Sequence, residues 1–470
     1  MDKSYSAVMS RRNDIMKKAM GLDYSDYEIN PFAFDYEKMM SDTGFSLEKI
    51  REIQLAGKVG NTPLLELKNI TNLVRKHSKK GFGARIFIKD EACNASGSFK
   101  ARRASISAYV AKMKGYKGMA AATSGNYGAA VASQASMYNL GCIILQEVFD
   151  SKYTGQPEII EKSRKCEAYG AEVVQLSVGP ELFYCLLDIL EETGFFNASL
   201  YTPFGIAGVE TLGVEIANQC MDMVGKFPEH VVITHAGGGN LTGTARGLKK
   251  SGADKTSIIG ASVDLSGLHM ASDNDFNKKS FTTGHTGFGI PFATWPDRVD
   301  VPRNAARPLR YMDRYVLVNQ GEVFFTTELL AQLEGLERGP AGNTSLAAAI
   351  ALASTLPEDE VIVVQETEYT GAGKHPTAQL SFAKKMGIDV RVGNPEENQP
   401  GINIVIPESI GQIKVNEQSM EKLKKSYIKN VRNNFPELDI MDENNKKFLM
   451  DELKIKDFEI IKSYFMGDKK

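Results

Sequence analysis

One lysine stands at a junction where a lysine retained only for solubility would be out of place. Residues 84–89 (Ala-Arg-Ile-Phe-Ile-Lys) predict a buried strand, and residues 94–98 predict a loop. A helical pattern begins at residue 101, so Lys100 lies near the positive end of a helix, where a cation is disfavoured. A lysine with a lowered pKa suits this position, because its neutral amine is the nucleophile that forms Schiff bases. The alternative is a solvated surface lysine. The residues of the other loops help to distinguish it from a Schiff-base lysine.

A glycine-rich loop is a candidate phosphate site. It follows a predicted strand at residues 231–234, and it consists of Gly237, Gly238, Gly239, Asn240 and Leu241. Glycines let the backbone approach closely, and the free N–H groups of a helix start face the anion. A simple turn is the alternative. A dinucleotide site is disfavoured, because the loop lacks the Gly-x-Gly-x-x-Gly spacing.

Two further loops carry polar groups. The loop at residues 123–128 suits a carboxylate, with a helix cap as the alternative. Its candidate substrate residues are Thr123, Ser124, Gly125, Asn126 and Tyr127. Asn126 can also donate a hydrogen bond to a phenolate-type oxygen. The loop at residues 370–376 follows a predicted strand at its C-terminal end, where open α/β sheets bind ligands.

Together these features suit pyridoxal 5′-phosphate (PLP): Lys100 holds the aldehyde and the glycine loop holds the phosphate. Predicted strands alternate with helices of ten or more residues, which implies right-handed crossovers and parallel sheets. The predicted strands span residues 84–89, 118–123, 142–146, 170–175, 231–234, 257–263 and 361–365. The fold class is therefore α/β.

Bulk properties exclude several other classes. A net charge of -2 over 470 residues lacks the excess positive charge that is typical of nucleic-acid-binding proteins. We expect no membrane span, because no apolar run is long enough, and we expect a cytoplasmic protein because residues 1–5 lack an apolar signal core. The five cysteines form no Cys-x-x-Cys pair and the six histidines no His-x-x-x-His pair, which argues against disulfides and against a metal centre.

The chain resembles the fold type II PLP enzymes, the group of tryptophan synthase β, cysteine synthase and threonine synthase. Their motif Asn-Pro-Thr-Gly-Ser-Phe-Lys-Asp-Arg stands here as Asn-Ala-Ser-Gly-Ser-Phe-Lys-Ala-Arg at residues 94–102. The resemblance implies two open twisted parallel-sheet domains with the cofactor in the cleft between them. It implies that Lys100 is the PLP lysine, that Asn126 bonds the cofactor's 3′-oxygen, and that residues 237–241 bind its phosphate.

The resemblance offers two residues for the pyridine nitrogen. Thr370 begins a stretch similar to the Thr-Gly-x-Gly-Leu-Lys of threonine synthase, although one residue is missing before Lys374. Ser345 lies in a stretch like the Ser-Gly-Ala-Ala of cysteine synthase. The choice stays open. A hydroxyl group at this nitrogen disfavours a fully protonated pyridinium and favours chemistry at the β-carbon.

A closer resemblance, carried by residues 9–16, residues 99–104 and the long C-terminal tail, is to a two-subunit group within this fold type. It implies a thiolase-type acyltransferase of ornithine catabolism, which cleaves a small amino-oxo acid with coenzyme A to give alanine and acetyl-CoA. The implied partners are a small α subunit and further copies in an oligomer. Two alternatives remain: a threonine-synthase-like or ammonia-lyase enzyme, and a non-catalytic PLP-binding regulatory subunit. Cys93, beside the lysine loop, is either an acyl carrier or a packing residue.

We expect four regions along the chain. Residues 1–55 form a helical extension, either wrapped on a neighbouring subunit or domain, or a partly ordered arm. Residues 56–103 and 205–392 form the large PLP-binding domain, and residues 104–204 form the small substrate-carboxylate domain. Residues 393–470 form a connector and a helical tail, either an interaction surface or a solvated amphipathic cap.

Overall fold

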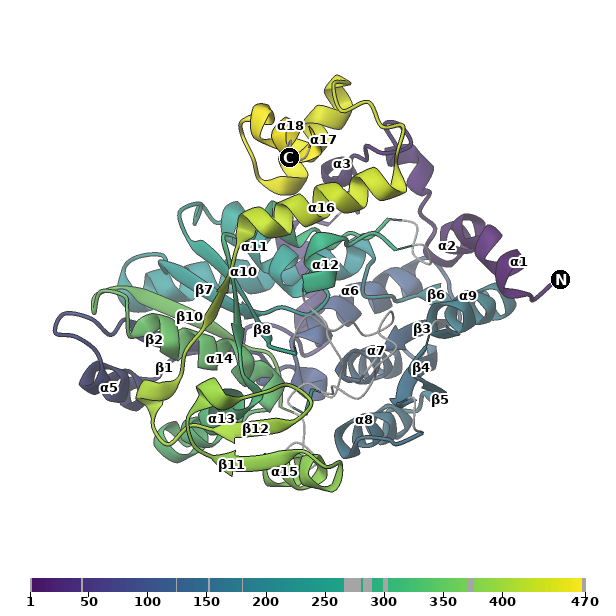
Figure 1. Ribbon diagram of the computed structural model, residues 1–470. Helices are drawn as coiled ribbons and strands as arrows, with labels where there is room; N and C mark the ends of the chain where they lie inside the picture. The colour runs from purple at the N-terminus through teal and green to yellow at the C-terminus, as the bar shows by residue number, and fades with distance from the viewer. Residues whose placement is uncertain are drawn as a thin grey trace.

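The computed structural model describes most of the chain as an α/β protein built on two sheets (Figure 1). The described residues are 2–43, 45–123, 125–150, 153–179, 181–265, 280–281, 290–298, 303–369 and 376–466. Ser124 and Thr370, both expected at the site, lie outside these ranges. In the described part, no helix is both long and apolar enough to cross a membrane.

The larger sheet has seven strands in the order β1-β2-β10-β7-β8-β9-β13. The five central strands, β2, β10, β7, β8 and β9, are parallel. The edge strands β1 and β13 are antiparallel to their neighbours. The strands are β1 (Leu64–Glu66), β2 (Arg85–Asp90), β7 (His230–Thr234), β8 (Ser257–Val263), β9 (Arg314–Val318), β10 (Val361–Glu366) and β13 (Asn416–Gln418).

The smaller sheet has four parallel strands in the order β5-β4-β3-β6. They are β3 (Gly118–Thr123), β4 (Gly141–Phe149), β5 (Glu172–Ser177) and β6 (Phe196–Asn197). A separate parallel pair joins β11 (Asp389–Val392) to β12 (Asn403–Ile406). Parallel strands require crossover connections, which helices supply here.

Helices cover both faces of the larger sheet. Along β7, Val231 and Ile233 pack into one apolar cluster, whereas Val232 between them packs into another. This alternation follows from the two-residue period of a strand, and burial on both faces is typical of parallel sheets. The helices of the sheet-bearing region are α5 (Lys68–His77), α6 (Lys100–Met113), α7 (Asn126–Met137), α8 (Pro157–Ala168), α9 (Glu181–Thr193), α10 (Pro203–Val224), α11 (Gly239–Lys250), α12 (Ile290–Thr294), α13 (Gln320–Glu334), α14 (Pro340–Ala353) and α15 (Pro376–Lys385).

The two ends of the chain pack on each other and on the sheet-bearing region. The N-terminal helices are α1 (Tyr5–Ser10), α2 (Arg12–Met20), α3 (Tyr36–Asp42) and α4 (Leu47–Ala56), and the C-terminal ones are α16 (Met420–Asn434), α17 (Glu443–Leu453) and α18 (Phe458–Met466). The ring of Phe32 lies 5.2 Å from that of Phe435 and 5.1 Å from that of Phe448. The yellow α17 accordingly lies near the purple α3 in Figure 1. The extension therefore packs on its own chain in this structure.

Several elements differ from the boundaries that the sequence predicts. α6 runs through the expected boundary at residues 103/104, and α10, which begins at Pro203, runs through the expected boundary at residues 204/205. The expected connector after residue 392 contributes two strands, because β12 pairs with β11 and β13 pairs with β9. The division of the chain into four regions remains our proposal.

Candidate active site

The lysine loop is fixed to the end of the central strand β10. Ser96 and Gly97 adopt left-handed backbone angles, with φ of 64° and 74°. A side chain at position 97 would place its Cβ 2.9 Å from the carbonyl oxygen of Tyr369, so this close approach favours glycine. The N–H of Phe99 donates to the carbonyl of Thr367 at 3.1 Å, and the N–H of Tyr369 donates to the carbonyl of Gly97 at 2.8 Å. These bonds hold the loop at the C-terminal edge of the sheet.

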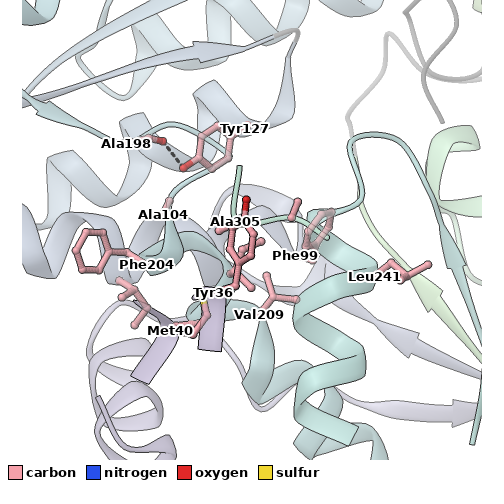
Figure 2. Packing of buried hydrophobic residues seen from close by; sticks show 14 of the residues in the cluster. Tyr36, Met40, Phe99, Ala104, Tyr127, Ala198, Phe204, Val209, Leu241 and Ala305 are labelled. Carbon is pink, nitrogen blue, oxygen red and sulfur yellow. Dashed lines mark hydrogen bonds between the residues drawn. The ribbon is translucent and has the colours of Figure 1, made fainter. Parts of the chain in front are cut away.

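Lys100 is the first residue of α6, as the sequence predicts, and it lines a cavity of about 150 Å³. Its Nζ lies 4.9 Å from the centre of the Phe99 ring. Phe99 itself is buried in the apolar cluster that also contains Leu241 (Figure 2). Lys100 is half-buried, and its amine thus lies over a buried aromatic ring at the edge of the cavity.

The glycine loop forms a second wall of the same cavity, and all five predicted residues, Gly237 to Leu241, line it. Gly238 caps α11 with φ of 81°, a left-handed conformation that suits glycine. The buried amide nitrogen Nδ2 of Asn240 has no hydrogen-bond partner among the described residues. Free backbone donors at a helix start and an unpaired amide together form a site for an anion.

The third wall is the start of α7. Thr123, Gly125, Asn126 and Tyr127 line the cavity. The hydroxyl of Thr123 accepts hydrogen bonds from the N–H groups of Gly125 at 2.9 Å and Gly128 at 3.1 Å, which fixes the turn. Tyr127 donates its hydroxyl to the carbonyl of Ala198 (Figure 2). The Nδ2 of Asn126 is buried without a partner among the described residues, so this amide can donate to a ligand.

Ser345 does not reach this cavity. Its hydroxyl is fully buried in α14 and donates to the carbonyls of Gly342 at 2.7 Å and Gln365 at 3.0 Å. On the side nearest α14 and β10, the cavity is lined by Ala341, Thr367 and Glu368. Thr370, the other hydroxyl predicted for the ring nitrogen, lies outside the described residues.

Several lining residues have no counterpart in the sequence-based set, and three of them, Arg103, Lys162 and Tyr201, stand near the predicted loops. Arg103 is buried, and burial lowers its pKa to about 10, against the opposing effect of Tyr127 and Tyr201. Lys162, from α8, is buried in an ion pair with Glu158 and lies against Gly125. Tyr201 also lines the cavity. Only Arg103 carries a local signal, because a residue three positions after Lys100 lies on the same helical face.

These groups fit PLP. Its phosphate needs donors and cations, its phenolic oxygen needs a donor, and its aldehyde needs an amine. The cavity presents the amine of Lys100, two unpaired amides, a helix start and the guanidinium of Arg103. No cluster of three or more His, Cys, Asp or Glu side chains suited to a metal ion occurs among the described residues.

Comparison with known proteins agrees with this chemistry. The family described as "Pyridoxal-phosphate dependent enzyme" matches residues 55–368, and the chain belongs to that family. PLP is therefore its cofactor, and the expectation of a fold type II PLP enzyme is confirmed.

Particular relatives are more informative. The chain is 71% identical over 429 residues to a "2-amino-4-ketopentanoate thiolase beta subunit" from an unknown prokaryotic organism, covering 91% of each chain. It is 65% identical over 462 residues to the protein of the same name from Acetoanaerobium sticklandii, covering 98% of each. Among solved structures, a threonine deaminase from the organism abbreviated T.th. is 25% identical with a TM-score of 0.52, covering 70% of this chain and 99% of that one.

Proposed function

We propose that this chain is the PLP-bearing β subunit of a 2-amino-4-oxopentanoate thiolase. The observation that carries the proposal is the 65% identity, over 98% of both chains, to a thiolase beta subunit. The reaction is a cleavage with coenzyme A: the bond between C3 and C4 breaks, the thiol sulfur bonds to C4, and the thiol proton replaces the lost bond at C3. The products are acetyl-CoA and alanine. We further propose that this step belongs to ornithine catabolism in the cytoplasm.

The residues of the cavity divide the work. When bound, PLP withdraws electrons from the carbons next to the substrate's amino group. We propose that Lys100 holds the cofactor aldehyde and, once released, moves protons at the substrate carbons. Thr123, Ser124 and Gly125 to Tyr127 bind the substrate carboxylate, and Asn126 also bonds the cofactor's phenolic oxygen. Gly237 to Leu241 bind the phosphate, with Thr370 at the ring nitrogen, because the hydroxyl of Ser345, the other predicted candidate, does not line the cavity.

Coenzyme A is proposed to attack directly, without an acylated cysteine. The five cysteines are Cys93, Cys142, Cys166, Cys185 and Cys220, and burial raises the pKa of each. None of them lines the cavity. Because the thiolate is the reactive form of a thiol, these cysteines are poor nucleophiles.

The cofactor experiment uses the purified holoenzyme and the variant Lys100→Ala. We expect a visible absorption band that borohydride abolishes in the native protein and that is missing in the variant. Lys112→Ala is the matched control, because Lys112 is an exposed lysine near the other end of the same helix. An unchanged band in Lys100→Ala would refute the lysine assignment.

The reaction experiment supplies alanine and acetyl-CoA and measures free coenzyme A, with and without the small α subunit that we propose as partner. We expect release of coenzyme A when both subunits are present. No release under any pairing would discard the thiolase proposal. Ammonia released from threonine or diaminopropionate would favour a lyase instead, and no turnover of any of these substrates would favour a regulatory subunit.

A further inference from the structure

Two adjacent arginines at the start of α6 have opposite surroundings. Arg102 is fully buried, and its guanidinium donates to the carboxylate of Glu91 at 2.6 and 2.8 Å and to that of Glu215 at 2.8 and 2.9 Å. Burial alone would raise the pKa of Glu215, but Arg102 and Lys89 lower it to about 2. Arg102 is thus a structural cation whose charge is neutralised within the protein.

Arg103 has no such compensation. Only 4% of it is exposed, yet no described residue forms a hydrogen bond or an ion pair with its guanidinium. The groups around it are aromatic: its guanidinium carbon lies 5.5 Å from the centre of the Phe99 ring, and the phenols of Tyr127 and Tyr201 are near enough to affect its pKa. A buried, unpaired charge is strongly unfavourable, so a counterion is needed.

The guanidinium points to where that counterion belongs. It lies against the glycine loop, because a Cβ built on Gly239 would be only 2.1 Å from its Nη2. Gly239 is the first residue of α11, so the positive end of that helix faces the same space. Lys100, three residues earlier on α6, lines the same cavity, and its Nζ packs on the same Phe99 ring.

We propose that Arg103 binds the phosphate group that occupies the Gly237–Leu241 loop, and that this phosphate is that of PLP. A planar guanidinium offers paired donors that match phosphate oxygens, and such charge-assisted bonds are stronger than those of backbone amides alone. The guanidinium of Arg103 would therefore bind the phosphate together with the backbone N–H groups of the glycine loop. This inference rests on membership of the PLP-dependent family and does not depend on the thiolase reaction.

The experiment compares binding of PLP with binding of pyridoxal, which lacks the phosphate, to the apoenzyme. For Arg103→Gln we expect PLP to bind about ten- to a hundredfold more weakly, the effect of one buried charge-assisted hydrogen bond, while pyridoxal binds as before. Arg103→Lys keeps the charge and should recover part of the loss. Lys112→Gln removes an exposed charge near the C-terminal end of the same helix and should change neither affinity.

Two results would overturn the proposal. An equal loss of PLP and pyridoxal binding in Arg103→Gln would mean that the arginine only supports the fold of the cavity. Unchanged PLP binding, together with a lost preference of the holoenzyme for coenzyme A over pantetheine, would assign the arginine to a phosphate of coenzyme A instead. Both experiments measure the binding of a ligand and not turnover. Their results can therefore be interpreted even if the protein does not catalyse the thiolase reaction.

Discussion

Gly208 of α10 sets how closely that helix approaches the first turn of α6, which carries both Lys100 and Arg103. A Cβ built on Gly208 would lie 2.1 Å from the carbonyl oxygen of Arg102, whereas ordinary contacts begin at 3.4 Å. The side chain of Gln54 joins the two helices by donating to the carbonyls of Gly208 at 2.7 Å and Arg102 at 3.3 Å. Gly208→Ala must therefore move the helices apart by about 1.3 Å, the difference between those two contact distances.

The expected cost follows from two opposing effects. Overpacking of this kind costs about 1–3 kcal/mol, and alanine in place of a helical glycine returns up to about 1 kcal/mol. We expect Gly208→Ala to lower the free energy of unfolding by about 1–2 kcal/mol, measured by urea denaturation with saturating PLP. Affinity for PLP should fall as well, because the moved turn carries Lys100, which we propose as the cofactor lysine.

Gly205→Ala, one turn earlier on α10, is the matched control. Its Cβ would meet no described atom closer than 3.5 Å, so the substitution should be neutral or slightly stabilising. If the two variants unfold at the same urea concentration and bind PLP equally, the contact between α6 and α10 does not position the site, and this reasoning fails.

Two further predictions concern ionisable groups. Burial raises the pKa of Glu147 to about 7, above the 4.5 of an unfolded chain, so this carboxyl lowers stability as the pH rises from about 4.5 to 7. Glu147→Gln should raise the free energy of unfolding by about 2–3 kcal/mol at pH 8 and hardly at pH 5, and an equal gain at both pH values would contradict this. Cys93→Ser should leave turnover unchanged, since burial and Asp90 raise the pKa of Cys93. Mass spectrometry of protein treated with acetyl-CoA should find no acetyl-cysteine, and a Cys93 adduct would refute direct attack.

The sequence predicts four of the five central strands, because β2, β7, β8 and β10 are continuous apolar runs bounded by turns, whereas β9 is missing from the predicted strands. It does not predict β13, whose residues Asn-Glu-Gln have no strand preference and become a strand only by pairing with β9. The expected boundary at residues 204/205 falls inside α10 for a different reason. Glycine weakens an isolated helix, yet Gly208 allows α6 to approach, so tertiary packing overrides the local preference.

The residues of the candidate site also fall into those that the sequence predicts and those that only the structure identifies. Lys100 and the loops at residues 123–127 and 237–241 lie beyond the C-terminal ends of strands, and the structure brings the described ones around one cavity. Helical spacing places Arg103 on the face of Lys100, but it does not show which of Arg102 and Arg103 keeps an uncompensated charge. What separates them is Glu91 and Glu215, which lie far from each other in the chain and meet only in the folded protein.

The contact between the chain ends has a consequence for synthesis. Phe32 packs between Phe435 and Phe448, so residues made first find their partners only after the last part of the chain has left the ribosome. At about 5–20 residues per second, the roughly 400 intervening residues take on the order of 20–80 s to translate. For that time the aromatic face of the nascent N-terminus lacks its native cover, which makes it a surface for chaperones. A chain that terminates before residue 435 would keep it exposed permanently.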